Sequence, residues 1–354
     1  MDFSFDPEAV DLASGLRELF AKSLGSAVLR RAVGDPTARR DVWRSAADLG
    51  LHSVLIDERA GGLGLGWEAA VLLLRELGRA AAPGPFIDSI AVAPALLQTM
   101  DDDRARVLLG EIASGEQRVV VSDGGRPLAS AEDATLVLAV EGTRLSAFAP
   151  REGSFVPVPS LDDAMPLHRL RPGAERTPVL DVALPEPVIA RARAAGAVAA
   201  AAELVGVASR IVELTRDYVA QREQFGRVIG SFQAVQHPLA DAAVLTTFAG
   251  PVVDAASWAL ATDQPDYAVA VSHAKHAATT AAMTAARTGF QLHGAMGYTY
   301  EYDLQIWMKR ARTLAMLYGT DSEHLAVLRE AVPRLGRAAA VGGRAPLSRA
   351  VPAR

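Results

Sequence analysis

Hydrophobic residues recur at helical spacing in the first third of the chain, through residues 10–20 and again through residues 69–77. One apolar stripe at a period of about 3.6 residues is typical of an amphipathic helix that packs on a core. A glycine cluster at 61–66 separates the two patterns, and Trp67 stands where a phosphate-binding glycine motif needs its third glycine. We therefore expect a helical N-terminal domain over residues 1–115, with a loop at the glycines.

Between residues 116 and 187 the pattern changes to short β-branched or alternating runs, at 118–121, 135–138 and 177–182. Clusters of turn residues, such as Ser-Asp-Gly-Gly and Arg-Pro-Gly, separate these runs. Short strands of this kind predict a small antiparallel β sheet or barrel. A doubly wound parallel sheet is not expected, because no long helical pattern lies between the strands.

Helical spacing returns after residue 187, where Leu204, Val207 and Ile211 step by three and four along one face of a long helix. Alanines and glycines over 194–206 allow a second helix to approach this one closely. Further helices are expected at 231–262, 264–291 and 302–316, and from 320.

These patterns predict a chain that is mainly α with a small central β domain. The expected parts are an N-terminal helical domain (1–115), a small antiparallel β sheet or barrel (116–187), a C-terminal four-helix bundle (188–341) and a tail (342–354). The tail is rich in Pro, Gly and Arg, a composition that predicts disorder.

Composition excludes several classes of function. The formal net charge of −5 offers no basic excess for nucleic acid, and a chain without cysteine has no disulfide or thiolate metal site. His273 and His276 lie three apart without a third ligand nearby in sequence, so no metal is expected. The N-terminus lacks a signal-peptide profile, and the most apolar segment, 192–207, is interrupted by glycines and a glutamate. We therefore expect no membrane insertion and a cytoplasmic location.

Two motifs in the predicted bundle hold residue types suited to binding a nucleotide. The first, REQFGRVIGSFQ at 222–233, places a guanidinium, an amide and an aromatic ring together at a helix end. An arginine fork matches a phosphate and a ring packs on a planar heterocycle, although the same residues could simply end a helix over a core phenylalanine. The second, QLHGAMGYTYE at 291–301, sets two glycines three residues apart and so allows close backbone approach to a flat or phosphorylated ligand.

Together with the Gly-Thr pair at 319–320, these motifs resemble the C-terminal domain of the acyl-CoA dehydrogenases, and the stretch AGGLGLG…ELGRAAAPGP resembles their N-terminal domain. The order of helices, β domain and helices matches as well. The resemblance implies an oxidoreductase that binds FAD between two subunits and removes hydrogens from Cα and Cβ of an acyl-CoA thioester. In that family a carboxylate takes the α-proton, flavin N5 takes the β-hydride, and an electron acceptor reoxidises the flavin.

The resemblance also implies which residues contact FAD. Arg222 and Phe225 match positions at its adenine end, and Gln291 with the Gly294–Ala295 pair matches the cradle of the diphosphate and adenosine, where the family usually has a second glycine. Thr320 would help to hold the flavin of its own subunit. The other residues would reach a flavin bound mainly by the neighbouring subunit: Arg222, Gln224, Phe225, Gln233, Gln291, Gly294 and Ala295.

The chain departs from the family at the catalytic base. Many members have Glu directly before the Gly-Thr pair, where this chain has Tyr318, and others place the base on the first long helix of the bundle, where the matching residue is Gly196. Tyr318 is a poor base, because a phenol with a pKa of about 10 stays protonated at neutral pH and burial raises that pKa further. Glu203 and Asp321 are weaker candidates that could equally be a buried structural carboxyl and a helix-capping residue.

The β domain departs from the family as well. The region 119–149 contains no Trp and lacks the Thr-Glu-Pro…Gly-Ser-Asp stretch with which family members hold the isoalloxazine ring. The residues that would contact a flavin in the neighbouring subunit are thus present, whereas most of those that would bind the chain's own flavin are missing.

We therefore predict a subunit of a heterotetrameric acyl-CoA dehydrogenase of lipid metabolism, in which a second dehydrogenase-like chain supplies the catalytic Glu and this chain completes its FAD pocket. Actinobacterial pairs of this kind act on CoA thioesters of steroid side chains, so a bulky acyl-CoA is the expected substrate. Two alternatives stay open. One is a self-sufficient homo-oligomeric enzyme with a displaced carboxylate base, and the other is a non-catalytic structural partner.

Overall fold

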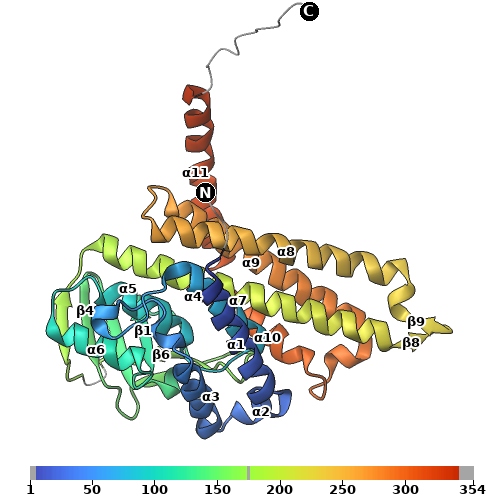
Figure 1. The fold of residues 1–354 in the computed structure, drawn as a ribbon, viewed down its shortest axis with the longest axis horizontal. Coiled ribbons are helices and arrows are strands. Elements are labelled where there is room, and N and C mark those ends of the chain that lie inside the picture. Colours follow the sequence, from blue (N-terminus) through green and yellow to red (C-terminus); the bar gives the residue numbers. More distant parts are fainter. Residues whose placement is uncertain (1–4, 174–175, 343–354) are drawn as a thin grey trace, which may run out of the picture.

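The computed structural model describes residues 5–173 and 176–342, so that the predicted tail lies outside them apart from its first residue. Figure 1 shows the N-terminal helices and most strands gathered at one end and long helices extending to the other. A one-turn π-helix, Asp88–Val92, precedes α5. The N-terminal helices are α1 (Pro7–Ser23), α2 (Ser26–Ala32), α3 (Pro36–Asp48), α4 (Gly66–Ala80), α5 (Ala93–Leu97) and α6 (Asp103–Ala113).

Two small sheets follow, with strand orders β1-β3-β4-β7 and β2-β6-β5. Their strands are β1 (Val119–Asp123), β2 (Leu128–Ala129), β3 (Leu136–Glu141), β4 (Arg144–Phe148), β5 (Phe155–Val158), β6 (Leu167–Leu170) and β7 (Leu180–Ala183). The prediction of an antiparallel sheet is wrong for one pair, because β1 runs parallel to β3 with Val119 opposite Leu136. Residues 124–135 form the crossover that parallel neighbours require.

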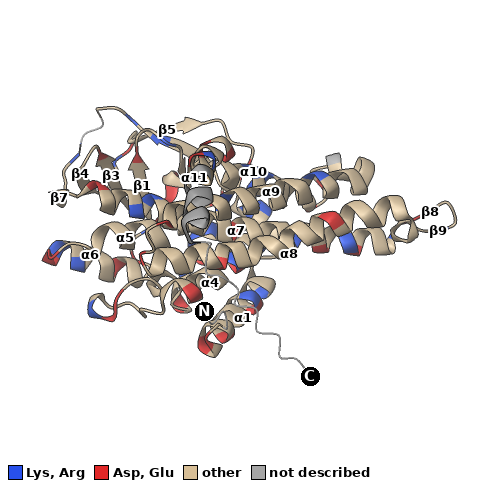
Figure 2. Cartoon of the chain, turned by 90° about the horizontal axis from the view of Figure 1, so that it is seen from above, with Lys and Arg blue, Asp and Glu red and all other residues tan. Residues whose placement is uncertain are grey.

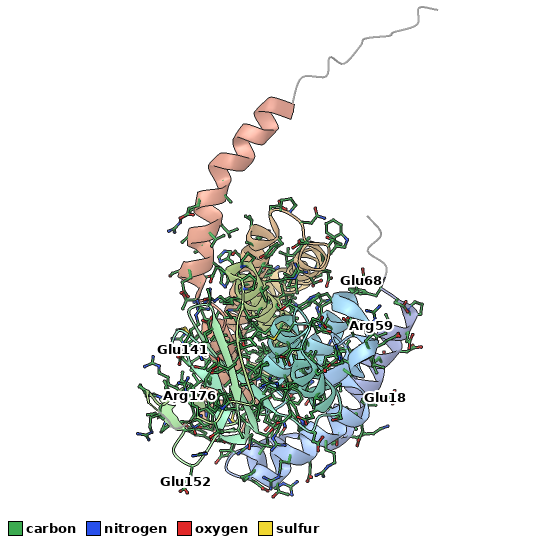
Figure 3. The ribbon with its side chains drawn as sticks, turned by 90° about the vertical axis from the view of Figure 1, so that its left-hand side faces the viewer. Glu18, Arg59, Glu68, Glu141, Glu152 and Arg176 are labelled. Carbon is green, nitrogen blue, oxygen red and sulfur yellow. The ribbon has the colours of Figure 1, made fainter. Side chains whose placement is uncertain are left out.

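Most of the remaining described chain lies in five α-helices: α7 (Glu186–Gln221), α8 (Gln233–Ala261), α9 (Tyr267–His293), α10 (Leu304–Met316) and α11 (Asp321–Gly342). The helices predicted at 231–262, 264–291 and 302–316 are confirmed as α8, α9 and α10. The long α7 runs along the molecule and packs on α4, α8, α9 and α10 (Figure 1), whereas α11 extends away from the body (Figure 3). A mainly α fold with a small β region is therefore confirmed.

Two of these helices, α7 and α8, are long and apolar enough to cross a membrane by length and composition alone. The apolar stretch of α7 is 83% buried inside the protein, as expected of a core helix. That of α8 is only 28% buried, and Val244, Leu245 and Phe248 are exposed on it. Contiguous exposed apolar surface on a single chain usually marks a contact surface. Elsewhere basic and acidic residues are interspersed along the elements (Figure 2).

The backbones of α4 and α7 touch at two glycines. A Cβ atom on Gly78 would lie 2.0 Å from the carbonyl oxygen of Glu203, and one on Gly206 would lie 1.9 Å from that of Arg75. Real Cβ atoms do not approach an oxygen so closely, so only glycine permits this crossing. The close approach expected from the small residues of 194–206 is therefore confirmed.

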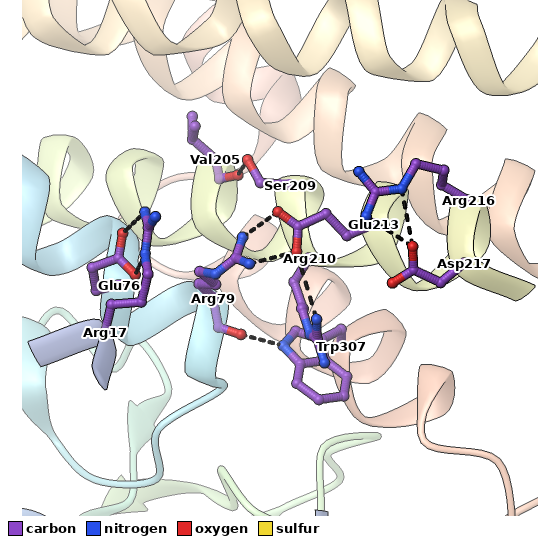
Figure 4. Close-up of polar contacts among 10 residues, drawn as sticks. All are labelled: Arg17, Glu76, Arg79, Val205, Ser209, Arg210, Glu213, Arg216, Asp217 and Trp307. Carbon is purple, nitrogen blue, oxygen red and sulfur yellow. Dashed lines mark hydrogen bonds and ion pairs between the residues drawn. The ribbon is translucent and has the colours of Figure 1, made fainter. Parts of the chain in front are cut away.

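Polar contacts fasten the N-terminal helices to the bundle beside this crossing (Figure 4). Arg17 on α1 pairs with the buried Glu76 on α4, with Nε–Oε2 at 2.9 Å. Arg79 on α4 makes a two-point ion pair with Glu213 on α7, and its carbonyl oxygen accepts a hydrogen bond of 2.8 Å from the Trp307 indole on α10. Two-point pairs fix orientation as well as distance, so α1, α4, α7 and α10 are held as one body.

Replacing Gly206 by Ala should lower the free energy of unfolding by about 3 kcal/mol, because the new methyl group would force α4 and α7 apart. Urea unfolding followed by circular dichroism measures this change. The matched control is Gly15→Ala in α1, where nothing lies within 4 Å of an added Cβ. The control should keep or slightly raise stability, by up to about 1 kcal/mol. Equal losses in the two variants would contradict the close crossing.

Candidate active site and flavin-contact surface

Tyr318 lies directly against Gly196. A carbon at the Cβ position of Gly196 would be 2.2 Å from both Cδ1 and Cε1 of the Tyr318 ring. The two slots at which members of the resembled family carry their base are therefore neighbours in space. Here a phenol ring and a bare backbone fill them, and any side chain at position 196 would displace the ring.

Two buried side chains hold the turn that carries Tyr318. The Lys275 ammonium, only 1% exposed, donates hydrogen bonds to the carbonyl oxygens of Ala315 (3.2 Å) and Gly319 (3.1 Å). The Nε2 atom of His324 lies 3.1 Å from the carbonyl oxygen of Tyr318. Tyr318 itself has φ of +55°, a left-handed conformation that costs a non-glycine residue free energy. The turn is thus held in place by hydrogen bonds to its carbonyl oxygens.

The protonation of these two groups follows from burial. Desolvation lowers the pKa of Lys275 to about 8, opposed by Asp321 and Glu323, so the ammonium stays mostly charged at neutral pH. Desolvation, followed by the charge of Lys275, lowers the pKa of His324 to about 4. A neutral imidazole has one N–H, and Nε2 must carry it because a carbonyl oxygen only accepts. Nδ1 then accepts from the Ser272 hydroxyl at 3.2 Å.

Thr320 begins α11 with a capping box. Its backbone N–H and its hydroxyl both donate to Oε2 of Glu323, at 2.7 and 2.9 Å, and these hydrogen bonds lower the pKa of that carboxyl. Asp321 turns to His276, with Oδ1 2.6 Å from Nδ1. The contact of Thr320 with a flavin stays a prediction, and such a contact would have to share the hydroxyl with the cap.

A cavity opens beside Tyr318, between the N-terminal helices, the β region and α7. The space in it that a water molecule can reach is about 50 Å3. The walls are mostly apolar, with two carboxyl groups, Asp88 and Glu203, among them. At the partly exposed rim, Arg193 makes a two-point ion pair with Asp123, with Nε–Oδ2 at 2.6 Å. Asp321 is not among the residues that line the cavity.

Asp88 is a cavity residue that sequence reasoning missed. It begins the π-helix Asp88–Val92, is 8% exposed, and accepts a 2.7 Å hydrogen bond through Oδ2 from the Val121 amide on the outer edge of β1. Desolvation raises its pKa to about 7, opposed only by that hydrogen bond. The available signal was a lone carboxylate inside the apolar run Phe86–Val92, which is also what an ordinary core segment with one capping residue looks like.

Glu203 enters the cavity from α7 and is 3% exposed. No hydrogen bond to its carboxyl group is found within the described residues. Desolvation raises its pKa to about 7, opposed by the positive charge of Arg310. That guanidinium bonds elsewhere, to Asp162 at 2.6 Å and to the carbonyl oxygen of Ala82 at 2.8 Å. Glu203 is therefore a buried acid without a hydrogen bond, whose charged neighbour is Arg310, and Nη2 of that guanidinium likewise has no hydrogen-bond partner among the described residues.

The two nucleotide-type motifs meet at the opposite end of the bundle. Tyr218 near the end of α7 stacks on His293 at the end of α9, with ring centroids 4.2 Å apart. A hairpin of β8 (Glu223–Gln224) and β9 (Arg227–Val228) projects beyond this end (Figure 1), and Phe225 at its tip is 90% exposed. The predicted contact residues that gather here are all exposed: Arg222, Gln224, Phe225, Gln233, Gln291, Gly294 and Ala295.

These exposed residues fit the diphosphate and adenosine of a dinucleotide. The set combines a guanidinium, amides and an aromatic ring, and Gly294 has φ of +57° with nothing within 4 Å of the place where a Cβ would stand. A phosphate could therefore approach the backbone there. We call this set the bundle-end surface.

Thr320 is far from the bundle-end surface. Lys275, which contacts Gly319, and His293 lie on the same helix, α9, eighteen residues apart (275 to 293). At 1.5 Å per residue this is about 27 Å. The structure thus separates the predicted FAD contacts into two sets, one beside the cavity and one at the bundle end. No group of three metal-ligating side chains occurs among the described residues.

The raised pKa of Glu203 predicts how stability depends on pH. The unfolded carboxyl loses its proton near pH 4.5 and the folded one near 7, so the free energy of unfolding should fall as pH rises through this window. The full loss is about 3 kcal/mol. Glu203→Gln should remove this part of the pH dependence. Urea unfolding of both proteins between pH 4.5 and 8 tests it, and parallel curves would contradict the raised pKa.

Family models and relatives agree on what the chain is similar to. Residues 6–116 match the model described as acyl-CoA dehydrogenase, N-terminal domain, and residues 187–332 match that of the acyl-CoA dehydrogenase C-terminal domain. The acyl-CoA dehydrogenase IpdE2 of Mycobacterium tuberculosis is 33% identical over 316 residues, which cover 89% of this chain and 94% of the relative.

Two solved structures have the same fold over nearly their whole length. A variant of the Tcur3481–Tcur3483 steroid ACAD superposes with a TM-score of 0.79 at 25% identity, covering 93% of this chain and 99% of that one. The ChsE4–ChsE5 complex of Mycobacterium tuberculosis gives a TM-score of 0.78 at 22% identity, covering 98% and 100%. With both family models matched, this chain belongs to the acyl-CoA dehydrogenases, a family of oxidoreductases that act on CH–CH bonds.

Proposed function

We propose that this chain is a subunit of an FAD-dependent acyl-CoA dehydrogenase and completes the FAD pocket of a partner chain that carries the catalytic Glu. The observation that carries the proposal is the contact of Tyr318 with Gly196. Neither of the two positions that hold the base in the family carries a carboxylate here. The ring of Tyr318 takes up the space that a side chain at position 196 would need. In this proposal a second subunit supplies the group that removes the α-proton.

The bundle-end surface supports the same proposal. Its residues are exposed in the single chain and lie about 27 Å along α9 from the cavity, and in this proposal they contact a nucleotide that the partner holds. The uncovered apolar face of α8, the helix that begins at Gln233, offers a further surface for the partner, with Phe248 70% exposed. Two relatives by fold are named as pairs of chains, Tcur3481–Tcur3483 and ChsE4–ChsE5.

In this proposal the residues of this chain bind and orient rather than move protons. Arg222 supplies charge-assisted hydrogen bonds to a diphosphate, Phe225 packs on the adenine, and Gly294 lets the phosphate approach the backbone. FAD itself, when bound, accepts the β-hydride of the acyl-CoA. The substrate is a bulky acyl-CoA, as the similarity to a steroid ACAD suggests, and the enzyme serves lipid metabolism in the cytoplasm.

Arg222→Ala and Gln291→Ala should each weaken FAD binding by the complex of this chain with its partner, about tenfold for Arg222 because a charge-assisted hydrogen bond is lost. FAD per complex, measured by absorbance after gel filtration, gives the result. The control is Arg216→Ala, an exposed arginine in the last part of α7 that pairs with Asp217, and it should leave the FAD content unchanged.

Two outcomes of this experiment speak against the proposal. Unchanged FAD in both variants would favour the non-catalytic structural partner, which stabilises the complex without touching the flavin. Stoichiometric FAD and full turnover by the isolated chain would favour the self-sufficient homo-oligomer.

The second candidate function is this homo-oligomeric enzyme with Glu203 as its base. It is favoured by the position of Glu203 in the cavity and by a pKa of about 7, near that of an effective base. Glu203→Gln should then reduce exchange of the α-proton of an acyl-CoA with deuterium at least 100-fold while FAD is retained. Asp321→Asn, outside the cavity, should leave the exchange rate unchanged. Exchange that persists in Glu203→Gln would exclude this function.

A further inference from the structure

A separate cleft lies in the N-terminal part of the protein, between the second half of α3 and the chain that joins α6 to β1. The space in it that a water molecule can reach is about 470 Å3, and it shares no lining residue with the cavity beside Tyr318. Three arginines line it, namely Arg40, Arg44 and Arg118. Arg44 pairs with Asp41 on its own helix, at 3.4 Å. The other two arginines decide what this cleft, here called the arginine cleft, can bind.

Arg118 is held in place through its backbone and through one nitrogen of its side chain. Its amide donates to Oγ1 of Thr135 at 2.9 Å, and its carbonyl oxygen accepts from the amides of Thr135 and Leu136. Its Nε donates to the carbonyl oxygen of Asp133 at 2.6 Å. No partner of its two Nη atoms is found among the residues that the structure describes. A guanidinium fixed in this way loses little further freedom when it binds an anion.

The acids near these arginines are already used by another residue. Asp133 binds the buried Arg39, with Oδ1 3.1 Å from Nη2, and Glu132 pairs with the same guanidinium at 2.8 Å. Arg40 is exposed on α3, and its guanidinium donates to the Thr37 hydroxyl at 3.2 Å. Within the described part of the chain, Arg40 has no acidic partner. The charges of Arg40 and Arg118 are therefore not neutralised by an ion pair there.

The two unpaired guanidiniums repel each other across the cleft. Burial lowers the pKa of Arg118, the charge of Asp133 opposes this effect, and the like charge of Arg40 adds to it. Two exposed carboxylates, Asp48 and Glu116, also line the cleft, but neither forms an ion pair with its arginines in the chain as described. An anion between Arg40 and Arg118 would replace this repulsion with two attractions.

The charges of the lining determine which anion fits. A phosphate monoester carries about two negative charges at neutral pH, and a guanidinium can bind two of its oxygens at once. A single carboxylate would neutralise only one of the two arginines. Asp48 and Glu116 would repel a ligand with more charge, such as a polyphosphate. The walls are rigid, because the Trp43 indole donates to the carbonyl oxygen of Gly115 at 2.7 Å.

We propose that the arginine cleft binds the phosphate monoester of a small polar molecule, with Arg40 and Arg118 holding the phosphate. The volume of the cleft lies in the range of small-molecule sites, so it leaves space for the rest of the molecule beside the phosphate. The proposal is independent of the proposed function, because no residue of the cleft belongs to the predicted FAD contacts or to the cavity beside Tyr318.

The experiment is a titration of the full chain with glycerol 3-phosphate near pH 7.5, at a constant ionic strength of about 0.15 M. The indole N–H of Trp43 lies in the cleft, and its NMR signal reports binding in the wild type and in every variant. A Kd of about 1 mM is expected for two charge-assisted contacts. Acetate should bind at least about tenfold more weakly, because it can neutralise only one arginine.

Substitutions assign the binding to the two arginines. Arg118→Gln and Arg40→Gln should each raise the Kd about tenfold, because each removes one charge-assisted contact. Arg40→Gln breaks only an exposed hydrogen bond to Thr37, so it tests the site even if Arg118→Gln disturbs the start of β1. The matched control is Arg106→Gln, which removes the same charge from α6 outside the cleft and should change the Kd by less than about twofold.

A wild-type Kd above about 10 mM would overturn the proposal, and so would equal effects of Arg40→Gln and Arg106→Gln. Acetate that binds as tightly as glycerol 3-phosphate would overturn the assignment to a phosphate. A short phosphoserine peptide is the last probe, because a phosphorylated protein carries the same group. If this peptide binds more than about tenfold more tightly than glycerol 3-phosphate, the assignment to a small molecule is overturned.

Discussion

The contact between the backbones of α4 and α7 sets the positions of most other elements. Gly78 rests on the carbonyl of Glu203 and Gly206 on that of Arg75, so each helix supplies one glycine to the crossing. Because α7 runs 36 residues, from the β region to the projecting hairpin, its attachment to α4 fixes both ends of the molecule at once. The cavity, the turn at Tyr318 and the bundle-end surface all depend on where this helix lies.

The same crossing explains why an acid is buried at Glu203. The backbone of Glu203 packs directly against Gly78 of α4, and this contact fixes the position from which its side chain enters the cavity wall. Burial of a carboxyl without a partner is unfavourable, and the packing of α4 on α7 must offset that cost. The packing of the two helices thus keeps the Glu203 carboxyl in a place where burial raises its pKa. Groups with shifted pKa values of this kind are common at functional sites.

Local sequence patterns predicted the positions of the helices well, but they missed some of the residues that line the cavity. The positions of α8, α9 and α10 follow from apolar spacing within each helix, and this spacing needs no tertiary information. The parallel pairing of β1 with β3 was missed because strand direction depends on how residues 124–135 cross over. Asp88 was missed because one acid in an apolar run gives no sign of what it faces. The contact of Tyr318 with Gly196 joins residues more than a hundred positions apart, and only the family resemblance pointed to both.

The length of α9 separates the two sets of residues that the proposed function uses. The turn at Tyr318 and the cavity lie at one end of the helix, and Arg222 and Gln291 lie at the other, about 27 Å away. Under the proposed function, a change at the first end can leave the second intact, because about 27 Å of helix lies between them. A subunit that has lost its base can still present a complete bundle-end surface. Under the proposed function, a chain with Tyr318 in place of the carboxylate needs a partner for catalysis. The partner in turn needs this chain to complete its FAD pocket.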